Sequence, residues 1–147
     1  MIRTSIASPQ EIVALPYEQL RETSRIVLEG EGVKEAKISL AFVDNTTIHR
    51  INKQFLEHDE PTDVITFPLS NAGAKKLEGE LVIGIEIAME QAAERGHGVE
   101  TELCLYVIHG LLHLCGYDDR SKKDAAEMRV KEREYLKLLK LPDIAGA

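Results

Sequence analysis

The sequence predicts an α+β fold in which one four-stranded sheet packs against about five helices, with a long apolar helix in the middle. Strand-like and helix-like segments alternate over most of the chain, and the last third shows only the helical spacing of apolar residues. The expected strands are residues 2–7, 36–43, 64–67 and 80–85. The expected helices are residues 16–29, 46–55, 87–95, 99–115 and 121–139.

The first three elements are a strand, a helix and a second strand. Apolar residues fall on alternate positions in 2–7 and in 36–43, which is typical of strands with one buried face. Between these strands, Pro16 suits the first turn of a helix and Gly30 suits its end. A helix that connects two strands in this way favours a layered fold.

A second helix and two further strands follow. Asp44 or Asn45 can cap the second helix, whose apolar residues recur at helical spacing. A short β-branched and aromatic run, 64–67, predicts a third strand that Pro68 ends. Residues 70–78 are expected to form an exposed connection, after which the fourth strand begins.

Three helices complete the chain. Gly96 and Gly98 separate the helix 87–95 from the long helix 99–115, whose many Val, Ile, Leu and Cys residues indicate burial on most sides. The last helix, 121–139, is charged and amphipathic. Its expected inward residues are Ala125, Met128, Tyr135, Leu138 and Leu139.

Length and composition predict one domain spanning residues 1–147, with a loose tail after residue 142. The sequence has no apolar run long enough to cross a membrane, and its first residues lack the apolar stretch of a signal peptide. We therefore expect a cytoplasmic protein that has no membrane partner.

The formal charge of −7 counts against broad, sequence-independent binding of nucleic acid, which depends on Lys and Arg. This net charge does not exclude a local basic surface. In the last helix the basic residues alternate with Glu127, Glu132 and Glu134, which favours a solvated, salt-bridged face.

One stretch within and just after the long helix has the spacing of a metal site. His109 and His113 are four residues apart, so their imidazoles share one face of a helix. Gly116 follows where a helix would end in a left-handed turn, and the chain can then return Asp119 toward the two imidazoles. Two nitrogen ligands, one oxygen ligand and an open fourth position are typical of a catalytic zinc site rather than a structural one.

Other interpretations of this stretch stay open. Asp118 could be the third ligand, or Asp119 could be a surface carboxylate beside Arg120. The two histidines could also be core residues that bond to carbonyl groups. We expect one divalent metal, zinc, although a carboxylate ligand shifts the preference toward manganese or iron and weakens Lewis acidity relative to three histidines.

The same stretch resembles the signature of the YbeY family, H-G-x-L-H-L-x-G-Y-D-H. It runs here from His109 to Asp118 and is followed by Asp119, where the family has a third His. A second family block, N-x-x-[YF]-R-x-x-D-x-P-T-D-V-L-S-F-P, appears at residues 52–68, and a third, G-D-I-x-I-x-x-E-x-A, at residues 79–88. The blocks stand in the family's order, so the resemblance covers nearly the whole chain.

The resemblance implies a metal-dependent, single-strand-specific endoribonuclease that acts in ribosomal RNA 3′-end maturation and ribosome biogenesis. It also implies a mixed sheet. The implied partners are RNA, namely the small-subunit precursor, and small-subunit ribosomal proteins. The implied metal ligands, which would act in catalysis through the metal, are His109, His113 and Asp119.

One further departure from the family concerns phosphate charge. Leu56 stands where the family has an Arg, which would bind phosphate through two parallel hydrogen bonds. Lys53, His58 and Arg120 are the candidates to contact phosphate in its place. Simple solvent exposure is the other interpretation of Lys53 and His58.

Two other functions stay open. A ribosome-assembly or interaction protein that binds metal but hydrolyses little would also suit Leu56, Asp119 and the acidic charge. The histidine spacing is shared with metalloproteases of the H-E-x-x-H class, which carry a general-base Glu directly after the first His. Gly110 stands at that position here, which counts against peptide hydrolysis.

Overall fold

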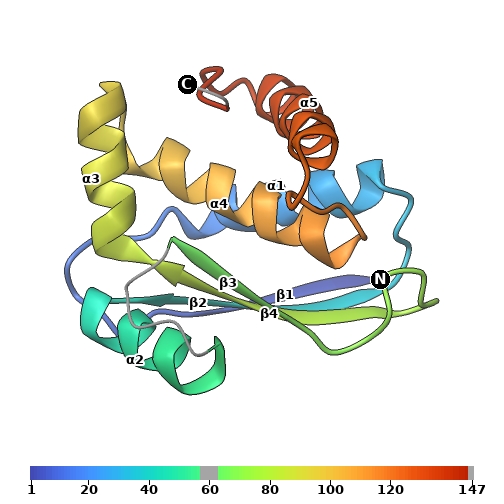
Figure 1. Cartoon of the computed structure of the whole chain (residues 1–147), viewed down its shortest axis with the longest axis horizontal. Coiled ribbons are helices and arrows are strands. Elements are labelled where there is room, and N and C mark those ends of the chain that lie inside the picture. The colour runs from blue at the N-terminus through green and yellow to red at the C-terminus, as the bar shows by residue number, and fades with distance from the viewer. Residues whose placement is uncertain (57–62, 146–147) are drawn as a thin grey trace.

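The computed structural model describes residues 1–56 and 63–145. Over these residues the chain forms one four-stranded mixed sheet and five helices, which confirms the predicted α+β class (Figure 1). The strands are β1 (Ile2–Ala7), β2 (Ala36–Val43), β3 (Val64–Pro68) and β4 (Leu77–Gly84). The helices are α1 (Tyr17–Gly30), α2 (Asn45–Leu56), α3 (Ile85–Arg95), α4 (Val99–Leu114) and α5 (Lys122–Leu138).

The sheet has the strand order β1-β2-β4-β3. β1, β2 and β4 run parallel, with Ala36 opposite both Ile2 and Leu77. β3 runs antiparallel to β4 and forms one edge of the sheet. The mixture follows from the connections. Helix α1 joins the parallel strands β1 and β2, whereas β3, which follows α2, leads into β4 without a helix.

β4 begins at Leu77, although the sequence predicted its start at residue 80 and an exposed connection up to residue 78. Leu77 is buried at the start of the ladder with β2. The sequence did not indicate this start, because Gly79 interrupts the alternation of apolar and polar residues by which a strand is recognised. Pairing along the whole length of β2 extends the strand past that glycine.

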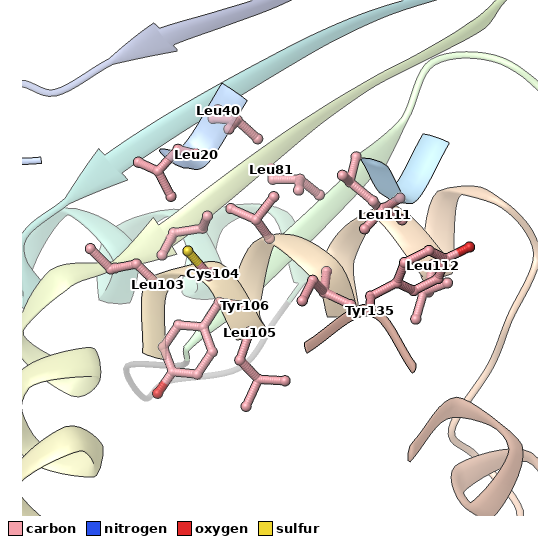
Figure 2. Close-up of a cluster of buried hydrophobic side chains, with 14 of the residues drawn as sticks. Leu20, Leu40, Leu81, Leu103, Cys104, Leu105, Tyr106, Leu111, Leu112 and Tyr135 are labelled. Atoms are coloured by element: carbon pink, nitrogen blue, oxygen red, sulfur yellow. The ribbon is translucent and has the colours of Figure 1, made fainter. Parts of the chain in front are cut away.

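Helix α4 lies at the centre of the fold and packs against α1, α3, α5, β3 and β4. Figure 2 shows its side chains among those of neighbouring elements, including Leu20 and Leu81. Two glycines allow it to lie close to the sheet. A Cβ at Gly79 would stand 2.6 Å from Leu114 Cδ1, and a Cβ at Gly110 would stand 2.6 Å from Leu81 Cδ2.

Helix α2 covers the opposite face of the sheet (Figure 1). Ile48 of this helix packs there with Val43, Ile65 and Val82 in a smaller core. The sheet therefore separates α2 from α4. No helix in the described part of the chain combines the length and the apolar character that a membrane span needs.

The last described residues pack against the fold. Ile144 and Ala145 are buried and join the main core, and Arg133 Nε donates to the Ala145 carbonyl at 3.1 Å. The expectation of a loose tail after residue 142 is therefore wrong for residues 144 and 145. Removing the Ile144 side chain from water stabilises this arrangement.

Candidate metal centre

The candidate ligands stand at the C-terminal end of α4 and just beyond it. After α4 ends at Leu114, Gly116 has a φ of +107°, which a glycine adopts at little cost. The N–H of Gly116 donates to the His113 carbonyl at 3.0 Å. The chain reverses at this turn, and Asp119 returns to the two imidazoles as the spacing predicted.

The three donor atoms converge on one point. The Nε2 atoms of His109 and His113 lie 3.1 Å apart, and Asp119 Oδ2 lies 3.5 Å from the first and 3.7 Å from the second. Donors bound to one zinc ion at about 2.0–2.1 Å in tetrahedral geometry stand about 3.4 Å apart. The residues present therefore fit one divalent metal and leave a further position for water or substrate.

Glu132 of α5 orients the imidazole of His109. Its Oε2 atom lies 2.7 Å from His109 Nδ1. Because a carboxylate only accepts, Nδ1 carries the proton and the Nε2 lone pair is left for a metal. Burial disfavours the charged imidazole, but the hydrogen bond and charge of Glu132, with Asp119 and Asp63, outweigh burial and raise the pKa of His109.

Glu132 does not lie on the solvated face that the sequence predicted for the last helix. Glu132 is 7% exposed and lies among the buried residues of α5, which include Met128 and Tyr135. These neighbours are four and three residues away, so the helical position of Glu132 was a signal of burial. Leu138, which was expected to face inward, is 63% exposed.

His109 and Asp63 both line three surface cavities. One of about 530 Å³ runs beside β3 and is lined by all three candidate ligands and by Arg120. A second, of about 450 Å³, extends to Arg95 at the end of α3. A third, of about 270 Å³, reaches α5 and Ile144. The site is therefore open to ligands much larger than water.

Of the three candidate phosphate contacts, Arg120 is the one that lines the same cavity as the candidate metal ligands in the described part of the chain. The Arg120 side chain is 88% exposed, and its Nε lies 3.5 Å from Asp118 Oδ2, so Asp118 rather than Asp119 stands beside Arg120. Lys53 lies on α2, across the sheet from α4, and does not line the three cavities at His109. His58 and the side chain of Leu56 lie outside the described residues. The phosphate-binding roles of these three residues stay predictions.

The position after the first histidine has a steric constraint that bears on protease chemistry. Gly110 faces Leu81, which is fully buried in the core. A Glu at position 110 would have to displace Leu81, because even its Cβ would stand 2.6 Å from the Leu81 methyl carbon. The Glu that serves as general base in the H-E-x-x-H class therefore does not fit at position 110 in this fold.

A family model described as Endoribonuclease YbeY matches residues 6–140. This chain belongs to the YbeY endoribonuclease family. An Endoribonuclease YbeY of Pelotomaculum thermopropionicum is 39% identical over 129 residues, which cover 83% of this chain and 85% of that protein. For the Endoribonuclease YbeY of Bacillus subtilis, the identity is 37% over 140 residues, with coverage of 86% and 89%. The solution structure of TM1509 from Thermotoga maritima matches with a TM-score of 0.67 and 31% identity, covering 95% of this chain and 89% of that one.

In this YbeY-family chain, Glu132→Ala should weaken zinc binding about 10- to 100-fold, because the His109 ring loses the hydrogen bond that sets its tautomer and direction. Glu132→Gln keeps an acceptor oxygen and should lose less. Glu127 is exposed on the same helix, so Glu127→Ala is the matched control. Isothermal titration with zinc measures the effect, and equal affinities in the two alanine variants would contradict the positioning role.

A buried ionic cluster near this YbeY-family site was not predicted from the sequence. Glu102 is fully buried in α4, and its Oε1 atom accepts from Arg95 Nη1 at 3.0 Å and lies 2.9 Å from His97 Nε2. An acidic residue inside an apolar helix was the available signal, because a buried charge requires a partner. The sequence did not identify that partner.

Proposed function

We propose that this chain is a metal-dependent endoribonuclease that cleaves single-stranded RNA. The proposal is carried by the convergence of His109, His113 and Asp119 beside open cavities, in a chain of the YbeY family. These three residues would hold one divalent metal, zinc in this proposal. When bound, zinc would lower the pKa of its water from about 15.7 to about 7 and so make hydroxide available at neutral pH.

The surrounding side chains have separate roles in this mechanism. Glu132 keeps the proton of His109 on Nδ1, which leaves Nε2 as a ligand. We assign Asp63, which lines each of the three cavities at His109, to accept a proton from the attacking water. Arg120 would neutralise phosphate charge in the cavity beside β3.

The proposed substrate is the precursor of small-subunit ribosomal RNA, and the proposed process is its 3′-end maturation during ribosome biogenesis. The activity named for the relatives supports RNA as the substrate class. Small-subunit ribosomal proteins are the proposed partners, and the cytoplasm is the proposed compartment. Because the chain carries a formal charge of −7, RNA would be held by local cations at the cavities rather than by the whole surface.

The purified protein should cleave a single-stranded fragment of ribosomal RNA and leave the same sequence uncut in a duplex. A chelator should abolish cleavage, and zinc should restore it. Asp119→Ala should lose zinc and cleavage, whereas Asp119→His should bind zinc at least as tightly as the parent, because imidazole is a good zinc ligand. Gel assays of labelled RNA and metal analysis of each variant are the measurements.

Asp118→Ala is the matched control, because Asp118 pairs with Arg120 outside the ligand set and should be dispensable for zinc. A greater loss of zinc in Asp118→Ala than in Asp119→Ala would show that the third ligand is misassigned. Zinc binding without cleavage, together with full rescue of ribosomal RNA processing by Asp119→Ala in cells that lack the protein, would favour an assembly protein over an enzyme.

A further inference from the structure

The cavity between His109 and Arg95 has features of a binding site that the metal ligands do not account for. It has a volume of about 450 Å³ and is walled by β3, α3, α4 and α5. Sites of this size hold small-molecule ligands, and one nucleotide unit is within that range. Among its described lining residues, Arg95 is the only one with a permanent positive charge.

A buried carboxylate fixes the guanidinium of Arg95. Glu102 is fully buried and accepts from Arg95 Nη1 at 3.0 Å, while the Arg95 side chain remains 27% exposed. A buried carboxylate is strongly dependent on its partners, so this pairing restrains the arginine. A guanidinium has five N–H donors, and among the described residues Glu102 alone accepts from Arg95, so the others remain for a ligand.

A second lining residue, Tyr106, carries a buried hydroxyl beside the carboxylate of Glu102. Tyr106 is 5% exposed, and its hydroxyl meets hydrogen-bond geometry with no atom of the described residues. Figure 2 shows its ring directed away from the strands of the sheet. Burial, the charges of Glu102 and Asp63, and the proximity of the hydroxyl to the Glu102 carboxylate raise the pKa of Tyr106, so the hydroxyl stays protonated and can donate. Buried hydroxyls normally have a partner, and a ligand in the cavity would supply one.

We propose that this cavity is the subsite for the nucleotide next to the cleaved bond of single-stranded RNA, in which Arg95 binds a phosphate and the Tyr106 hydroxyl donates to the nucleotide. This inference rests on the proposed function. Glu102, which holds Arg95, is in the first turn of α4, and Arg120 follows the turn after its end. The two cations therefore lie on either side of His109 and His113 along the helix. An RNA strand that crosses these two histidines would have one phosphate bound by Arg95 and another bound by Arg120.

The test is binding of a labelled single-stranded oligonucleotide with 2′-O-methyl groups to the zinc-loaded protein, measured by fluorescence anisotropy over a series of salt concentrations. A gel of the probe after each titration confirms that it stays intact. Arg95→Gln should weaken binding about 10-fold or more, as expected for lost hydrogen bonds to a charged group. It should also reduce the slope of log K against log salt by about 0.7, the value for one phosphate of a single strand. In cleavage assays the KM should rise more than kcat falls.

Tyr106→Phe removes only the hydroxyl and should weaken binding roughly 2- to 10-fold with an unchanged salt slope. Arg95→Lys keeps the charge and should keep the slope, with an affinity between those of the parent and Arg95→Gln. Arg21 is exposed on α1, so Arg21→Gln is the matched control and should bind as the parent does.

Thermal unfolding of each variant separates this role from a structural one. If Arg95→Gln lowers the unfolding temperature but leaves affinity and salt slope unchanged, Arg95 only clamps α3 to α4, and the inference is overturned. If Arg95→Gln does not fold, the affinities of Tyr106→Phe and Arg95→Lys for the oligonucleotide test the inference instead. Parental affinity in both variants would overturn the inference. A parent protein that binds no single-stranded probe would refute the proposed function as well, whereas RNA cleavage that is indifferent to Arg95 and Tyr106 would refute this subsite alone.

Discussion

His113→Ala should leave a folded protein that no longer retains a divalent metal. His113 supplies one of three converging donors, and its side chain is only partly buried, so its removal breaks the site but opens no cavity in the core. We expect about one zinc per chain in the parent and none that survives dialysis in the variant. RNA cleavage should disappear with the metal.

Thermal unfolding with and without zinc gives a second measurement of the same change. Free zinc at 100 times its Kd should stabilise the parent by about 2.7 kcal/mol and should not stabilise His113→Ala. His49→Ala, on α2 across the sheet, is the matched control and should keep both zinc and its stabilising effect. Unfolding of the zinc-free variant far below the zinc-free parent would show that His113 has a structural role instead.

Gly110→Ala should destabilise the protein by roughly 1–3 kcal/mol, the usual range for an overpacked core. Alanine favours a helix by about 1 kcal/mol over glycine, so the steric effect must exceed that gain. Its Cβ would stand 2.6 Å and 2.8 Å from the two methyl carbons of Leu81, which is fully buried. Because His109 is the preceding residue, the same displacement should also weaken zinc binding.

Denaturant titration tests this packing through a double-mutant cycle. Leu81→Ala alone should cost about 2–5 kcal/mol. The double variant should cost less than the sum of the two single changes, because the new methyl group enters the space that Leu81 leaves. Gly73 is exposed with nothing near its Cβ position, so Gly73→Ala is the matched control. Strictly additive losses would contradict direct packing of Gly110 on Leu81.

The elements that the sequence predicted well are those whose limits depend on local chemistry. Asp44 Oδ1 accepts from the N–H of Thr47 at 2.8 Å and caps α2, and Gly96 ends α3 with a φ of +74°. The convergence of the candidate ligand triad also follows from local chemistry, and its role in binding metal stays a prediction. His109 and His113 share a helix face, and the turn at Gly116 returns Asp119 over a short distance along the chain.

The features that the sequence did not reveal depend on partners far along the chain. Glu132 meets His109 only because α5 packs on α4, and no local pattern specifies that pairing. The start of β4 at Leu77 depends on β2, which pairs with it from Ala36 onward. Ile144 is buried because the fold offers it an apolar surface, which a short tail sequence cannot indicate.

The strand order also affects how fast the chain can fold. Both parallel pairs in the sheet join segments that are far apart in sequence, since Ala36 lies opposite Ile2 on one side and Leu77 on the other. Such pairings require large loops to close before any contact stabilises them, so mixed α/β chains fold more slowly than helical bundles of similar size. The ligand triad, by contrast, needs only one helix and one turn, but α5 must dock before Glu132 reaches His109. We therefore expect zinc to slow unfolding far more than it accelerates refolding.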